Sequence, residues 1–130
     1  MQKSFFLFLF LSSFLLAEAR TIAVSMDVVK SGITIIDIRT QPEWKESGMI
    51  QNAIPLTFFQ TDGSYDAEAF IQELNKHISK DKEFALICRT GHRSTVVSDL
   101  LSKQGYNVVN LQGGMNRLMS QGYVPTPYQP

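Results

Sequence analysis

The chain has 130 residues, of which 44% are hydrophobic and 18% are charged, so its composition is that of one globular domain and excludes a disordered chain. Twelve basic residues balance twelve acidic ones, which argues against the basic surface of a nucleic-acid-binding protein, and we expect no nucleic-acid partner. One cysteine and two histidines without ligand spacing make a metal site improbable, and we expect no metal and no other cofactor.

The first nineteen residues have the pattern of an export signal. Lys3 precedes an apolar run at Phe5–Leu16, and Ala17-Glu18-Ala19 matches a small-x-small cleavage site. The run has about a dozen residues and a spanning helix needs ~20, so an uncleaved anchor is the weaker alternative. We predict a signal peptide at 1–19, cleavage after Ala19, a periplasmic mature protein, and no stable membrane insertion after cleavage.

Helices and strands are expected to alternate along the mature chain. In chain order, the patterns predict a helix at 25–30 capped by Ser25, a strand at 33–36, a helical turn at 42–44, a strand at 53–56, an amphipathic helix at 66–78, a strand at 84–87, a helix ending at 104, a strand at 107–111 and a helix ending at 121. This order implies an α/β domain at 20–124, with a central, mainly parallel sheet and helices on both faces. The proline-rich tail at 125–130 is expected to be loose.

Residues able to do chemistry follow two of the predicted strands. Asp37-Ile38-Arg39 follows the strand at 33–36, and Cys88 follows the strand at 84–87. In parallel sheets, ligand sites lie beyond the carboxyl ends of the strands. We therefore expect Asp37, Arg39 and Cys88 to lie at one edge of the sheet.

The segment Cys88–Ser94 connects a buried strand to a helix. Free N–H groups and the positive dipole end of a helix favour an anion, and the same field favours a reactive thiolate. Arg89 and Arg93 add positive charge, and Gly91 permits the turn. In an exported chain Cys88 has no second cysteine with which to form an internal disulfide, so a functional thiol is favoured over a buried core residue.

These motifs resemble those of the rhodanese family of sulfurtransferases over most of the mature chain. Cys88–Ser94 matches the family's Cys-Arg-x-Gly-x-Arg-Ser loop at every defined position. Asp37-Ile38-Arg39, followed by Glu43-Trp44, is similar to the opening motif of the family. The layout is similar to that of exported single-domain rhodaneses.

Two further motifs are similar to those of the family but depart from them. In Gly48–Ile54 the family usually has His, Pro and Gly where this chain has Met49, Gln51 and Asn52. Leu111-x-Gly113-Gly114 is similar to the closing motif, although Leu118 stands where a tryptophan is expected. These departures concern local packing more than chemistry.

The resemblance implies that Cys88 takes the sulfane sulfur of thiosulfate or a similar donor, releases sulfite, and carries a persulfide to cyanide, a small thiol or the thiol of a partner protein. Backbone N–H groups would face the persulfide, and Arg89 and Arg93 would bind the donor. The expected donor-binding residues are Arg89, Thr90, Gly91, His92, Arg93 and Ser94, with Ser94 as the first helical residue or cap.

Several of these residues have simpler interpretations. As an alternative to binding the donor, Arg93 pairs with a carboxylate of the protein. We interpret His92 as a solvent-facing residue that tunes substrate choice, and not as a general base. Asp37 is expected to orient the loop backbone or Arg39, and Trp44 to pack in the core.

Two other functions remain open. A phosphatase or arsenate reductase also places a cysteine and an arginine around an oxyanion, but those phosphatases have five residues between the two, and here four separate Cys88 from Arg93. The shorter loop favours a sulfur atom over a tetrahedral phosphate. A non-catalytic persulfide carrier is the second alternative, and the intact loop favours catalysis over it.

Overall fold

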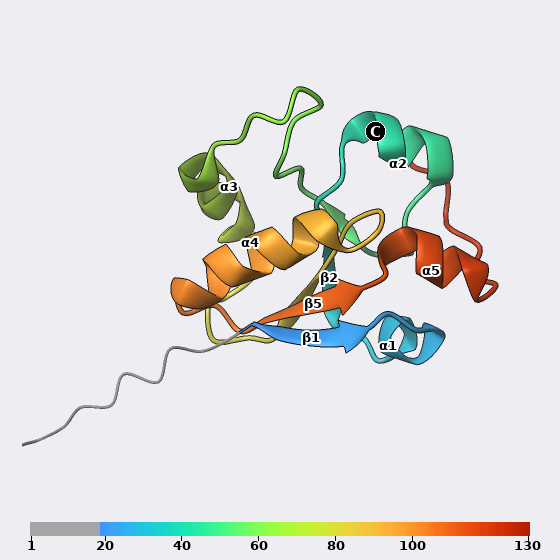
Figure 1. Cartoon of the computed structure of the whole chain (residues 1–130), viewed down its shortest axis with the longest axis horizontal. Helices are drawn as coiled ribbons and strands as arrows, with labels where there is room; N and C mark the ends of the chain where they lie inside the picture. Colours follow the sequence, from blue (N-terminus) through green and yellow to red (C-terminus); the bar gives the residue numbers. More distant parts are fainter. Residues whose placement is uncertain (1–18) are drawn as a thin grey trace, which may run out of the picture.

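The computed structural model describes residues 19–130 (Figure 1). The expected signal peptide falls almost wholly on residues 1–18, which lie outside the described part, so it stays a prediction. The elements, in chain order, are β1 (Arg20–Ala23), α1 (Met26–Lys30), β2 (Thr34–Asp37), α2 (Gln41–Ser47), β3 (Ile54–Pro55), α3 (Ala67–Leu74), β4 (Phe84–Ile87), α4 (His92–Lys103), β5 (Val108–Gln112) and α5 (Gly114–Ser120).

The five strands form one parallel sheet in the order β1-β5-β4-β2-β3. β4 lies at its centre and is buried at every residue, which explains the uninterrupted apolar sequence from Phe84 to Ile87. Because every strand runs in the same direction, all carboxyl ends meet at one edge. The predicted α/β class with a parallel sheet is confirmed.

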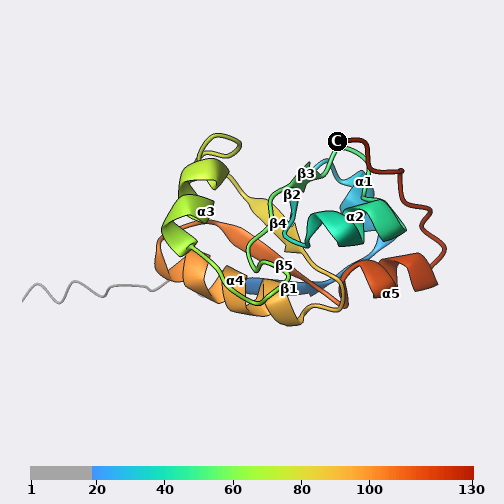
Figure 2. The same cartoon turned by 90° about the horizontal axis from the view of Figure 1, so that it is seen from above.

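Helices cover both faces of the sheet, as predicted (Figures 1 and 2). One face carries a core that includes Phe70 and Leu74 of α3 and Val97 and Leu101 of α4. The opposite face packs against α1 and α5. Between residues 19 and 130 no helix is long and apolar enough to cross a bilayer.

Two helices begin at side-chain caps, of which the cap at Ser25 was predicted. The hydroxyl of Ser25 accepts the N–H of Val28 at 3.2 Å, and the carboxylate of Asp66 accepts the N–H of Ala69 at 3.0 Å. The predicted end of α3 at residue 78 is wrong, because the helix stops at Leu74 and continues only as turns.

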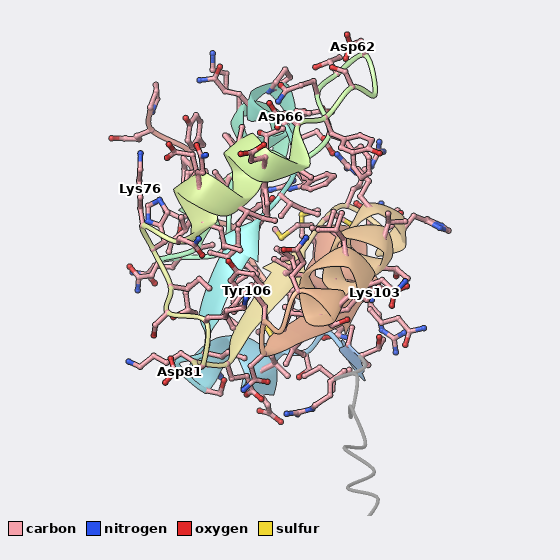
Figure 3. All side chains as sticks on the ribbon, turned by 90° about the vertical axis from the view of Figure 1, so that its left-hand side faces the viewer. Asp62, Asp66, Lys76, Asp81, Lys103 and Tyr106 are labelled. Carbon is pink, nitrogen blue, oxygen red and sulfur yellow. The ribbon has the colours of Figure 1, made fainter. Side chains whose placement is uncertain are left out.

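The turn after α3 is held from across the molecule. Tyr106 donates its hydroxyl hydrogen to Oδ1 of Asn75 at 2.5 Å, and this contact pins the chain where the regular helix ends. Figure 3 shows Asp66 at the start of α3 and Asp62 at the tip of the preceding loop.

Two differences from the sequence prediction concern the ends of the described chain. Strand β1 was not predicted, because Arg20–Ala23 is short and mostly exposed and is a strand only through its pairing with β5. The tail at 125–130, expected to be loose, is bound along α2 (Figure 2). Met49 and Thr126 exchange two backbone hydrogen bonds of 2.8 Å, and the ring of Tyr128 lies 5.4 Å from that of Trp44. These contacts offset the entropy of ordering the tail.

Candidate active site

The predicted site residues meet at the carboxyl edge of the sheet. Cys88 follows the last residue of β4, and Asp37 is the last residue of β2. Both are almost fully enclosed, with Cys88 1% exposed. Cys88 and the loop after it form one cluster, whereas Asp37 and Arg39 make no hydrogen bond to that loop in the described chain.

Two backbone N–H groups point toward the sulfur of Cys88. The N–H of Gly91 lies 3.1 Å from Sγ and the N–H of Ser94 lies 3.4 Å from it. The thiol donates to Oγ of Ser94 at 3.3 Å, and that hydroxyl donates to the carbonyl of Gly91 at 3.2 Å. Two N–H donors aimed at one sulfur stabilise negative charge there.

The turn depends on Gly91, which has φ +103° and caps α4. This left-handed conformation favours glycine, as predicted. The helix begins at His92, so Ser94 is its third residue. The expectation that Ser94 is the first helical residue or the cap is wrong, because Gly91 already takes that position.

A second glycine turn, Gly113-Gly114, supports the loop from the side of α5. The N–H of Met115 donates to the carbonyl of Cys88 at 2.9 Å, and the N–H of Asn116 donates to the carbonyl of Arg89 at 3.0 Å. A Cβ on Gly114 would lie 2.5 Å from each of these two carbonyl oxygens. Sequence analysis missed this role, although the paired glycines were its signal.

Arg93 is paired with Glu43 of α2 through two hydrogen bonds of 2.7 Å. The two side chains are 27% and 22% exposed. Hydrogen bonds from Arg93 are the largest cause that lowers the pKa of Glu43 to about 2, and the same bonds raise the pKa of Arg93. The structure therefore shows the carboxylate pairing that the sequence left open, and this pairing uses two of the five N–H donors of Arg93.

Asp37 and Arg39 form a buried support beside this pair. The guanidinium of Arg39 bonds both carboxylate oxygens of Asp37 at 2.8–3.2 Å. It also donates to the hydroxyl of Ser47 at 2.6 Å and to the carbonyl of Gly48 at 2.7 Å. The predicted role of Asp37 in orienting Arg39 agrees with this geometry, which ties the end of β2 to the end of α2.

The remaining loop side chains, Arg89, Thr90 and His92, are exposed. Within residues 19–130 no carboxylate pairs with Arg89, so its charge is available to a ligand. Arg89 and His92 line an open pocket of about 690 Å³ beside the loop. Trp44, by contrast, is buried as predicted.

A five-stranded parallel sheet, with a cysteine directly after its central strand and two N–H donors aimed at the sulfur, defines a cysteine-dependent α/β protein with an anion site. Comparison with known families specifies this class further. The family model of the rhodanese-like domain matches residues 24–121, and the chain belongs to this family. The resemblance predicted from the motifs is therefore confirmed.

Two known proteins are similar to the chain in sequence. "Putative sulfurtransferase YtwF" of Bacillus subtilis is 37% identical over 81 residues, which cover 62% of this chain and 68% of that protein. The uncharacterized protein RP600 of Rickettsia prowazekii is 27% identical over 99 residues, which cover 72% of this chain and 78% of that protein. Together with the family, the first relative supports a sulfurtransferase-type role.

Solved structures share the fold. A rhodanese-related protein from Thermoplasma volcanium superposes with a TM-score of 0.59 at 25% identity, covering 78% of this chain and 93% of that one. A rhodanese-like domain protein from Staphylococcus aureus gives a TM-score of 0.56 at 23% identity, covering 75% of this chain and 88% of that one. They support the fold assignment.

Proposed function

We propose that the protein transfers a sulfane sulfur from thiosulfate, or a similar donor, to cyanide or a thiol through a persulfide on Cys88. One observation supports this most strongly: the N–H groups of Gly91 and Ser94 converge on Sγ from the start of α4. An anionic sulfur is the species that such donors stabilise.

The first half-reaction conserves charge and electrons. The thiolate of Cys88 attacks the outer sulfur of thiosulfate, the new S–S bond forms as the old one breaks, and sulfite leaves with the electron pair of the broken bond. The terminal sulfur of the persulfide then carries the negative charge. In the second half-reaction, cyanide or a thiolate attacks this terminal sulfur and restores the thiolate of Cys88.

The two arginines have different roles in this proposal. Arg89 is free of carboxylates within the described chain and binds the dianionic donor. Arg93 is committed to Glu43 and acts as a positioning residue, because it ties the first turn of α4 to α2. Since Cys88 is almost fully enclosed, the donor approaches the sulfur end-on past Arg89 and His92.

The length of the loop weighs against the phosphatase alternative. Four residues separate Cys88 from Arg93, whereas the cysteine-dependent phosphatases have five, and the shorter loop suits a sulfur atom better than a tetrahedral phosphate. The persulfide carrier remains the second candidate, since the same N–H groups would stabilise a persulfide that is only stored. Turnover separates the two functions.

We propose further that the protein is exported and cleaved after Ala19. The apolar run and the Ala17-Glu18-Ala19 site support this, and cleavage there would leave β1 intact from Arg20. Cell fractionation and N-terminal sequencing of the native protein test it. A cytosolic protein that retains Met1 would contradict the proposal.

Steady-state transfer to cyanide tests the sulfurtransferase proposal. Thiosulfate, a thiosulfonate and polysulfide serve as donors, thiocyanate is measured, and Cys88→Ala is the control. We expect multiple turnovers with at least one donor and none with Cys88→Ala. A single sulfur delivered per chain would favour the carrier, and hydrolysis of an aryl phosphate that Cys88→Ser abolishes would favour the phosphatase.

A further inference from the structure

Two hydrogen bonds in series connect the sheet to the back of the Cys88 loop. Nδ2 of Asn110, on β5, donates to Oγ1 of Thr95 at 3.0 Å, and this hydroxyl donates to the carbonyl of Gly91 at 2.7 Å. Thr95 lies in the first turn of α4, directly after Ser94. Thr95 therefore holds the residue whose N–H faces the sulfur, and Asn110 holds Thr95.

Asn110 determines the direction of these bonds. An amide nitrogen can only donate, so the hydroxyl oxygen of Thr95 accepts from Asn110, and its one hydrogen is left for the carbonyl of Gly91. Asn110 is 1% exposed, and its other polar atom, Oδ1, has no hydrogen-bond partner in the described chain. A buried amide with an unpartnered oxygen costs stability, so the bond to Thr95 explains this residue better than packing does.

The hydroxyl of Ser94 has a single hydrogen and two acceptors within reach. Its oxygen lies 3.2 Å from the carbonyl oxygen of Gly91 and 3.3 Å from Sγ of Cys88. In the thiol form, the sulfur donates its hydrogen to Ser94, and Ser94 donates to Gly91. The thiolate has no hydrogen to give, so the hydroxyl of Ser94 can turn and donate to the sulfur. This turn removes one donor from the carbonyl of Gly91.

Thr95 compensates for the donor that this carbonyl loses. The carbonyl of Gly91 also accepts the N–H of Thr95 at 3.1 Å and the hydroxyl of Thr95 at 2.7 Å, so both of its lone pairs stay bonded. Resting on the proposed function, we propose that Thr95 and Asn110 are positioning residues, which free the hydroxyl of Ser94 to donate to the thiolate. The thiolate is the form that attacks the donor and the form that the acceptor restores.

Thr95→Val removes the hydroxyl and keeps the shape of the side chain. On the acid side of the pH–rate profile, we expect kcat with thiosulfate to fall about fivefold, because the thiolate loses one hydrogen bond, while KM stays unchanged. Thr95→Ser keeps the hydroxyl and should restore kcat. Thr34→Val is the matched control, since Thr34 is exposed at the amino end of β2, opposite the site, and it should change neither constant.

Asn110→Ala tests whether the two residues act in series. Without the amide, the hydroxyl of Thr95 is free to turn away from Gly91, so kcat should fall by about twofold. The double variant should be no slower than Thr95→Val alone, because the hydroxyl that Asn110 orients is already absent. Effects of the two substitutions that multiply, or a Thr95→Ser variant as slow as Thr95→Val, would overturn the inference.

Alkylation of Cys88 by iodoacetamide tests the same inference without sulfur transfer. On the acid side of the pH profile, Thr95→Val should be alkylated about fivefold more slowly than the wild type. On the alkaline plateau, where every thiol is ionised, the two rates should be equal. The substitution leaves the titratable groups of the site in place, namely Asp37, Arg39, Glu43, Arg89, His92 and Arg93.

The two measurements together separate this inference from the proposed function. Identical alkylation profiles, or a difference confined to the plateau, would overturn the inference, and turnover of thiosulfate by the wild type would then leave the function standing. The expected alkylation profiles in a protein that turns over no donor would support the positioning role and contradict the function.

Discussion

The loop that holds Cys88 and the pocket beside this loop are built in different ways. The loop region, which we call the floor, consists of Cys88, Gly91, Ser94 and the turn Gly113-Gly114, and backbone hydrogen bonds join its parts. The lining of the neighbouring pocket, which we call the wall, consists of side chains from α2, α4 and the loop between β3 and α3, among them Pro42, Val96 and Phe59. The comparison indicates that backbone geometry determines the surroundings of the sulfur, whereas side chains shape the pocket beside it.

The largest expected effect is on the floor, at Gly114. Gly114→Ala would place a Cβ 2.5 Å from the carbonyl oxygens of Cys88 and Arg89, at a φ of +62°. We expect the free energy of unfolding to fall by about 3 kcal/mol or more, measured by urea denaturation, together with a loss of sulfur transfer. Gly122→Ala is the control, with φ +98° and open space around it, and should cost only about 1 kcal/mol. Equal costs would show that the floor is not tightly packed.

The second-largest effect is expected for the Arg93–Glu43 pair, which joins α4 to α2. Glu43→Gln removes the charge that Arg93 faces and should lower the free energy of unfolding by about 2 kcal/mol at neutral pH. Because folding lowers the pKa of Glu43 from 4.5 to about 2, its stabilisation is complete above pH 4.5 and is lost as the pH falls toward 2. The two proteins should therefore become equally stable at the acid end of this range.

The exposed Glu46 on the same helix provides the control for this pH series. Among the ion pairs of residues 19–130 it has no partner, so Glu46→Gln should follow the wild type at each pH. A difference between Glu43→Gln and the wild type that stayed constant down to pH 2 would contradict the electrostatic origin of the effect.

A smaller effect is expected at the border between floor and wall. Arg89→Gln removes the available cation and should raise KM for thiosulfate about tenfold, with stability unchanged. Lys103→Gln, which removes an exposed cation at the far end of α4, is the control and should leave KM unchanged. If both variants raised KM equally, general attraction of anions would explain the effect and Arg89 would not be a donor-binding residue.

The smallest expected effect concerns the tail at 125–130, which packs against α2. Tyr128→Ala removes the ring that contacts Trp44 and should lower the free energy of unfolding by about 1 kcal/mol without changing kcat. Gln129→Ala, at an exposed neighbour, should change neither quantity. A large fall in kcat for Tyr128→Ala would show that the tail positions α2 and, through it, the Arg93–Glu43 pair.

Local patterns were enough to predict most of the fold and the centre of the site. The cap at Ser25, the apolar run of β4 and the loop Cys88–Ser94 each depend on neighbouring residues, so the sequence displays them directly. Gly91 was predicted for the same reason, because its positive φ belongs to a turn within the loop.

The features that sequence analysis missed depend on long-range contacts. Glu43 and Arg93 are 50 positions apart, and nothing local shows which carboxylate the arginine meets. Strand β1 exists through its pairing with β5, and the tail is ordered through Met49 and Trp44. Gly113-Gly114 was noted as part of a motif, but its contact with the carbonyl groups of the loop needs the folded sheet.

The central claim is that sulfur is carried covalently on Cys88, and intact-mass measurement after one equivalent of donor tests it directly. We expect the wild-type chain to gain the mass of one sulfur atom, peptide mapping to locate it on Cys88, and cyanide to remove it. Cys88→Ala should gain nothing. Sulfur transfer by Cys88→Ala, or a wild-type chain that turns over without ever gaining this mass, would contradict the claim.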